Sequence, residues 1–183
     1  MRVISGKYRG KVLHSLDGES TRPTGDRVKE SLFNIISSRV RDSVVLDLFA
    51  GSGALGIECL SRDAKKVVFC DNNPEAVNVI NRNLKNVEGD YEVVSGDFKT
   101  VLKGDVKYDI IFVDAPYRSN LARDAFNIIN AYRILTDDGV ICFERLFDLP
   151  VTLPDGLVVT DSRKYGKTAL DFIKYDEESR DNG

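Results

Sequence analysis

The sequence predicts a single α/β domain in which a mostly parallel sheet carries helices on both faces. Short apolar runs, nearly continuous and rich in Val, Ile and Phe, alternate with amphipathic segments from residue 43 onward. Such runs are typical of parallel strands that repeated βα units bury on both faces. The first run enters a glycine-rich turn at residues 51–56, which can bring backbone N–H groups close to a ligand. The chain's 183 residues suffice for one domain with a substantial core.

Residues 1–41 are predicted to form a basic extension in front of this domain. They hold nine Lys or Arg residues and four Asp or Glu residues, whereas the whole chain has a net charge of −3. A basic arm on an acidic body favours a polyanionic partner that approaches from one side. A merely solvated basic surface is the alternative at this point.

Two short strands and a helix are predicted within this extension. Residues 2–5 and 11–14 flank a glycine-bearing connection, which predicts a β-hairpin with Lys7, Tyr8 and Arg9 at its tip. Cations beside an aromatic ring suit contacts to phosphates and to the face of a base. A helix is predicted over about residues 26–38, because apolar residues recur there on one face with helical periodicity.

The domain proper, residues 42–175, is predicted to contain seven strands. Five belong to βα units and are therefore parallel, whereas the last two are joined by a glycine-bearing turn and are antiparallel. Residues 176–183 are polar and are predicted to be a disordered tail. The predicted strands are residues 43–48, 66–71, 91–95, 108–114, 139–144, 157–163 and 169–175, and the predicted helices are residues 54–62, 74–84 and 120–134.

Composition excludes several classes of protein. No apolar run reaches the length of a transmembrane span, and the N-terminus lacks the apolar core of a secretory signal, so a cytoplasmic location is expected. The three cysteines are widely spaced in apolar surroundings, which favours reduced core thiols. His14 is the only histidine, so neither a histidine-based metal site nor a Ser-His-Asp triad is expected.

Four aspartates end, or directly follow, consecutive predicted strands. Because the carboxyl ends of parallel strands meet at one edge, we expect Asp47, Asp71, Asp97 and Asp114 to gather on a single rim. Asp71 lies about 20 residues beyond the glycine turn, where an acid accepts hydrogen bonds from ribose hydroxyls. Asp97 is suited to accept from the exocyclic amine of adenine, with Phe98 beside the ring. These features indicate an adenosine moiety and fit NAD equally well.

The segment Asp114-Ala115-Pro116-Tyr117 indicates a site for an amino group on a planar base. Such an amine is a poor nucleophile because its lone pair is delocalised into the ring. Hydrogen bonds from its two N–H groups to the Asp114 carboxylate and to the Ala115 carbonyl favour a more tetrahedral, nucleophilic nitrogen, and Tyr117 is expected to stack on the base. A base within structured RNA or DNA must leave its stack to reach such a site.

Together these segments resemble a class I S-adenosylmethionine-dependent methyltransferase, and more narrowly the bacterial ribosomal RNA small-subunit methyltransferase D family, which is guanine-N2-specific on 16S rRNA. The family usually has proline where this chain has Ala115; since a backbone carbonyl is needed there, catalysis is expected to survive in a less rigid loop. The resemblance covers residues 1 to about 175 and is carried by residues 2–10, 21–24, 26–30, 46–53 and 163–168.

The resemblance implies a Rossmann-like fold and methyl transfer from S-adenosylmethionine to the N2 amine of a guanine in 16S rRNA. It implies that the small ribosomal subunit presents this guanine to a monomer that needs no metal. Asp47, Gly51 and Gly53 would hold the methionine end. The implied catalytic residues are Asp114, Ala115, Pro116 and Tyr117, the cofactor-binding residues are Asp47, Phe49, Gly51, Gly53, Asp71, Asn72, Asp97 and Phe98, and the RNA contacts are Lys7, Arg9, Arg22 and Arg27.

Three alternatives stay open from the sequence. One is an exocyclic-amine methyltransferase that acts on N6 of adenine or N4 of cytosine in DNA or RNA. The second is an NAD-dependent dehydrogenase, because Gly51, Gly53 and Gly56 followed by Asp71 also fit a dinucleotide. The third is a ribosome-binding protein that keeps the fold without catalysis.

Overall fold

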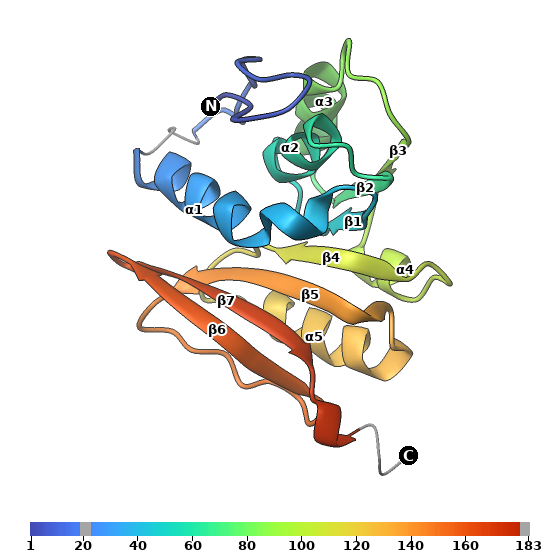
Figure 1. Ribbon diagram of the computed structural model, residues 1–183, viewed down its shortest axis with the longest axis vertical. Helices are drawn as coiled ribbons and strands as arrows, with labels where there is room; N and C mark the ends of the chain where they lie inside the picture. The colour runs from blue at the N-terminus through green and yellow to red at the C-terminus, as the bar shows by residue number, and fades with distance from the viewer. Residues whose placement is uncertain (19–22, 180–183) are drawn as a thin grey trace.

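The computed structural model describes residues 1–18 and 23–179, which form one seven-stranded sheet with helices on both faces (Figure 1). The strand order is β3-β2-β1-β4-β5-β7-β6. The strands β3, β2, β1, β4 and β5 are parallel to one another. Strand β7 is antiparallel to both β5 and β6. The strands are β1 Val44–Asp47, β2 Lys66–Asp71, β3 Tyr91–Ser95, β4 Tyr108–Val113, β5 Leu135–Leu146, β6 Leu157–Tyr165 and β7 Thr168–Tyr175. The helices are α1 Pro23–Val40, α2 Ala54–Ser61, α3 Pro74–Asn83, α4 Phe98–Leu102, α5 Leu121–Tyr132 and the 3-10 helix η1 Glu177–Ser179.

Two apolar layers sandwich the sheet. Helices α1, α2 and α3 contribute to one layer, and α4 and α5 contribute to the other. Successive residues of the central strands alternate between the layers; Val45 and Ile110 belong to the first, and Leu46 and Ile111 to the second. Each position of such a strand must be apolar because both faces are buried, which explains why the sequence shows continuous rather than alternating apolar runs.

The predicted α/β class and its seven strands are confirmed, with differences at several boundaries. Helix α1 begins at Pro23, three residues earlier than predicted, and proline is well tolerated in a first helical turn. Strand β5 begins at Leu135, although Asp137-Asp138-Gly139 is typical of a turn. Helix α4 was not predicted, because its five residues are too few to show a helical period. Of the predicted tail, Glu177–Ser179 form a 3-10 turn, and residues 180–183 lie outside the described part.

The N-terminal turn forms, but the two strands predicted beside it do not. An isolated antiparallel bridge joins Arg2 to Val12, and two backbone hydrogen bonds flank it, from the Val3 N–H to the Lys11 carbonyl (3.0 Å) and from the Leu13 N–H to the Met1 carbonyl (2.9 Å). The segment also lies along α2: the backbone N–H of Lys7 donates to the Ser61 carbonyl (2.8 Å). The backbone N–H of Tyr8 donates to the Ser61 hydroxyl (3.0 Å). The segment therefore combines a short antiparallel pairing with bonds to a helix, and it does not form two regular strands.

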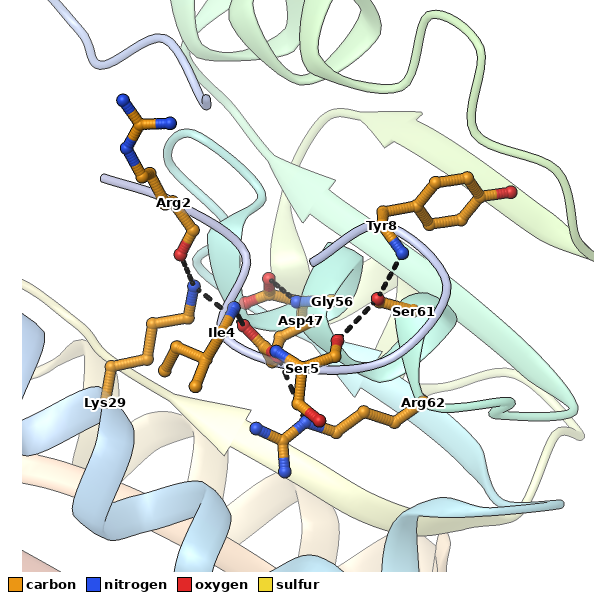
Figure 2. Close-up of polar contacts among 10 residues, drawn as sticks. Arg2, Ile4, Ser5, Tyr8, Lys29, Asp47, Gly56, Ser61 and Arg62 are labelled. Atoms are coloured by element: carbon orange, nitrogen blue, oxygen red, sulfur yellow. Dashed lines mark hydrogen bonds and ion pairs between the residues drawn. The ribbon is translucent and has the colours of Figure 1, made fainter. Parts of the chain in front are cut away.

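The carboxylate of Glu58 anchors this segment, and Figure 2 labels Ile4, Ser5, Lys29 and Arg62, which bind this carboxylate. Glu58 lies on α2 with no exposed side-chain surface, and it accepts hydrogen bonds from the backbone N–H groups of Ile4 (2.9 Å) and Ser5 (3.1 Å). Its oxygens also pair with Lys29 of α1 (3.1 Å) and with Arg62 (3.0 Å). A buried charge is tolerated when it is paired and hydrogen-bonded in this way. The N-terminal segment, α1 and α2 are thereby tied to one side chain.

The remaining predictions about the bulk of the chain concern thiols and membranes. Cys59, Cys70 and Cys142 are free and buried, as predicted. Within residues 1–18 and 23–179, no helix is both long and apolar enough to cross a membrane.

Replacing Gly6 with alanine is expected to detach the N-terminal segment from α2. Gly6 has φ of +91°, and a Cβ there would lie 1.8 Å from the Ser61 carbonyl oxygen. Because that oxygen belongs to the backbone, Gly6→Ala should lower the free energy of unfolding in urea by roughly 3 kcal/mol or more.

Gly10→Ala is the matched control for this substitution. Gly10 has a similar φ of +86°, but a Cβ there would meet no atom within 4 Å. It should therefore cost only the backbone strain, about 1–2 kcal/mol. Equal destabilisation by the two variants would contradict the proposed close approach.

Candidate active site

A cavity of about 680 Å³ opens at the carboxyl ends of β1, β2, β3 and β4. Most of the predicted site residues line it, which supports the expectation of a single rim. Asp47 and Gly53 do not line it. The lining residues are Leu16, Leu48, Phe49, Gly51, Cys70, Asp71, Asn72, Asn73, Ala76, Gly96, Asp97, Phe98, Lys99, Asp114, Ala115, Pro116, Tyr117 and Leu121.

Asp71 connects the glycine turn to the start of α3. One carboxylate oxygen accepts from the Gly51 N–H (2.9 Å), and the other accepts from the Asn73 N–H (2.9 Å). Asn73 in turn caps α3 by accepting from the Glu75 N–H (3.0 Å). Asp71 therefore fixes two loops of the cavity while its carboxylate remains part of the lining.

Asp47 has a different role from the one predicted. It is only 2% exposed, and its carboxylate accepts from the backbone N–H of Gly56 within α2 (3.0 Å). Burial raises its pKa to about 7, against the effect of the Gly56 hydrogen bond. We therefore correct the expectation that Asp47 holds a ligand directly: it orients the glycine turn from beneath.

Gly53 also acts through the backbone rather than as part of the lining. It precedes α2 as its N-cap residue with φ of +78°, a conformation that glycine adopts without steric cost. The turn is further held from α3, where the Asn83 side-chain amide donates to the Ser52 carbonyl (2.9 Å).

Asp97 and two phenylalanines form the part of the cavity near β3. Asp97 caps α4, and one of its oxygens accepts from the Lys99 N–H (2.9 Å). The rings of Phe49 and Phe98 lie 5.1 Å apart between centroids at a tilt of 52°. This arrangement combines an acidic acceptor with apolar ring surface, a combination suited to a purine that carries an amino group.

The segment 114–117 forms another part of the cavity lining. Ala115 is buried, whereas Tyr117 is 39% exposed and donates its hydroxyl to Glu144 Oε1 (2.8 Å). Burial, with the nearby Glu144 and Asp114 charges, raises the pKa of Tyr117 well above its ordinary value. Burial also raises the pKa of Glu144, although the Tyr117 hydrogen bond opposes that shift.

Glu144 is a site residue that the sequence reasoning missed. It ends the fifth predicted strand, at residues 139–144, and β5 is parallel to β4 with Phe143 paired to Val113. The rule that selected four aspartates at carboxyl ends of parallel strands therefore selects Glu144 as well.

The predicted RNA contacts are differently placed. Arg9 and Arg27 are exposed on the N-terminal segment and on α1. Lys7 is paired with Asp63 (2.9 Å), which also pairs with Arg41 (3.2 Å). Arg22 lies outside the described residues. Among the described residues, no group of three or more His, Cys, Asp or Glu is arranged to hold a metal ion.

Known proteins resemble this chain over nearly its whole length. It matches the family model Cons_hypoth95, described as conserved hypothetical protein 95, over residues 1–174. Ribosomal RNA small subunit methyltransferase D of Haemophilus influenzae is 36% identical over 172 residues, which cover 91% of this chain and 89% of the relative. YlbH of Bacillus subtilis is 40% identical over 182 residues, covering 95% and 98%. The solved structure of yhhF from Escherichia coli has a TM-score of 0.86 at 30% identity and covers 96% of this chain and 98% of that chain.

Replacing Asp47 with asparagine is expected to remove a pH dependence of stability. The pKa of Asp47 is raised to about 7 from 3.8, so the native state holds a proton that the unfolded state loses earlier. The wild-type free energy of unfolding should therefore fall as the pH rises through this interval. Relative to wild type, Asp47→Asn should gain at most about 3 kcal/mol between pH 5 and pH 8.

Urea unfolding at the two pH values measures this effect. Any pH-independent loss of unfolding free energy that the asparagine causes is the same at both values and cancels in their difference. Asp90→Asn, at an exposed acid, is the control and should leave the pH dependence unchanged. A pH dependence in Asp47→Asn that equals that of wild type would contradict the assignment.

Proposed function

The chain belongs to the ribosomal RNA small subunit methyltransferase D family, and from this premise we propose that it methylates the exocyclic N2 amine of a guanine in 16S rRNA, with S-adenosylmethionine as donor. One observation carries the proposal. The segment 114–117, which is suited to an amino group on a base, forms a wall of the same cavity that offers acceptors for an adenosine.

The lining fits the nucleoside part of S-adenosylmethionine. Asp71 is the acceptor for ribose hydroxyls, and Asp97 is the acceptor for the adenine amine, with Phe98 against the ring. The turn at Gly51 supplies backbone in the cavity lining, where a side chain would obstruct the methionine end. When bound, the donor supplies an electrophilic methyl group on a sulfonium, which is a good leaving group.

The chain's own contribution to the reaction is alignment and electrostatics. Asp114 and the Ala115 carbonyl accept the two N–H groups of the guanine amine and direct its nitrogen toward the donor. Tyr117 stacks on the base. The buried position of Ala115 keeps the carbonyl fixed without the proline that the family usually has there.

Substrate binding is assigned to the face that carries the N-terminal segment. Arg9 and Arg27 are the stronger candidates for phosphate contacts, since the charge of Lys7 is partly offset by Asp63. The dehydrogenase alternative loses support, because the sheet ends in the antiparallel pair β7 and β6 rather than in a second βαβαβ half.

Asp114→Ala is expected to lower the rate of methyl transfer about 100-fold or more, since the amine loses its charged acceptor. Affinity for S-adenosylhomocysteine should be retained. The assay is labelled methyl transfer to small subunits from a strain that lacks the enzyme, followed by mass spectrometry of the nucleosides. Asp105→Ala, at an exposed acid in a loop, is the control. Undiminished transfer by Asp114→Ala would refute the assigned chemistry, and N6-methyladenosine as the only product would refute the guanine assignment.

Charge reversal at Arg9 and Arg27 is expected to weaken binding of the small subunit. The double variant should raise KM about 10-fold and reduce the salt dependence of binding, because two phosphate contacts are lost. Lys103→Glu is the control: this exposed residue follows α4, a helix on the opposite face of the sheet from α1 and α2. An equal rise in KM for the control would show that only net charge matters.

A further inference from the structure

A second cavity, of about 320 Å³, adjoins the first across the segment 114–117. Ala115, Pro116 and Tyr117 line both cavities. The other walls of the smaller cavity come from the start of α5, the end of β5 and the loop that follows β5. Phe143, Leu149 and Pro150 give it apolar surface, and Arg118 and Arg123 give it positive charge.

Glu144 is the acidic residue among those that line the smaller cavity. It sits near the carboxyl end of β5, where it pairs in register with Leu170 of β7. Its Oε1 accepts the Tyr117 hydroxyl (2.8 Å). Since a carboxylate carries acceptor positions on both oxygens, this bond leaves Glu144 able to accept from a ligand donor as well.

The neighbouring cations are of two kinds. Arg145 pairs with Asp171 through its Nε (2.6 Å) and donates to the carbonyls of Leu146 and Phe147. Its charge is therefore already paired within the protein. Arg118 and Arg123 lie on the exposed side of the cavity, where the phosphates of a nucleotide would lie if its base entered.

We propose that this smaller cavity receives the acceptor guanine and that Glu144 selects it by accepting a hydrogen bond from guanine N1–H. The inference rests on the proposed function and deepens it. Guanine presents N1–H directly beside its N2 amine, so one base edge can meet Asp114 and Glu144 together. Adenine presents an unprotonated N1, an acceptor that a carboxylate repels. The apolar walls then contact the faces of the base, as Tyr117 does.

The competing role for Glu144 is to orient Tyr117 without touching the substrate. The two roles differ in what they predict for a base that keeps the 2-amine but lacks N1–H. 2-Aminopurine is such a base. If Glu144 reads N1–H, its substitution changes the preference between guanine and 2-aminopurine; if it only orients Tyr117, both substrates suffer equally.

The test uses small subunits reconstituted with 16S rRNA that carries guanine or 2-aminopurine at the mapped target. Wild type should methylate guanine with a kcat/KM about 10- to 100-fold higher than 2-aminopurine, the range for loss of a hydrogen bond to a charged group. In Glu144→Gln this preference should largely disappear, since an amide can donate to the unprotonated N1. 2-Aminopurine also lacks O6, and loss of O6 affects wild type and variant alike. The difference in preference between wild type and Glu144→Gln therefore reports on N1.

Two further variants separate selection from folding. Glu144→Ala should also lose the preference, whereas Tyr117→Phe, which keeps the carboxylate, should react more slowly but retain it. Affinity for S-adenosylhomocysteine should stay unchanged in both Glu144 variants, because Glu144 does not line the larger cavity. Absence of a wild-type preference, or an equal loss on both substrates in Glu144→Gln, overturns the role of Glu144 and leaves the proposed function standing. Absence of transfer to guanine by wild type overturns both.

Discussion

The buried carboxylate of Glu58 joins parts of the molecule that are far apart in the sequence. Helix α2 begins at the glycine turn, where the Gly56 N–H bonds Asp47, and further along it carries Glu58. One short helix therefore fixes the glycine turn and the N-terminal segment together. Removing one partner of such a buried ion pair typically costs about 3–5 kcal/mol, so the geometry of the N-terminal segment depends on this carboxylate.

The sheet could be predicted from the sequence because its central strands are buried on both faces, which leaves a signal in every residue. The conformation of the N-terminal segment could not be predicted in this way. Residues 2–5 have the composition of a strand, but the N–H groups of Ile4 and Ser5 are taken by Glu58. That carboxylate is more than 50 residues distant in the chain, and no pattern within residues 2–5 predicts a bond to it. Helix α4 was missed for the opposite reason, since it is too short to have a pattern.

The rim of the candidate site was predictable by position, but not by the direction in which each side chain points. Asp47 and Asp71 both end parallel strands, yet Asp47 turns beneath the glycine turn while Asp71 lines the cavity. The difference arises because Asp47 faces α2, whose Gly56 N–H offers it a partner. Glu144 was within reach of the same positional rule, but its pairing with Tyr117 joins two segments that the sequence does not connect.

The place of β7 has a consequence for biosynthesis. It is the last strand in the chain, yet it lies between β5 and β6 in the sheet (Figure 1). During translation, one edge of β5 therefore stays unpaired until β7 has been synthesised. Strand β6 has no paired strand in the sheet before then. The edge of β5 on which Glu144 pairs with Leu170 is thus completed last, and a prematurely terminated chain has the glycine turn without this pairing.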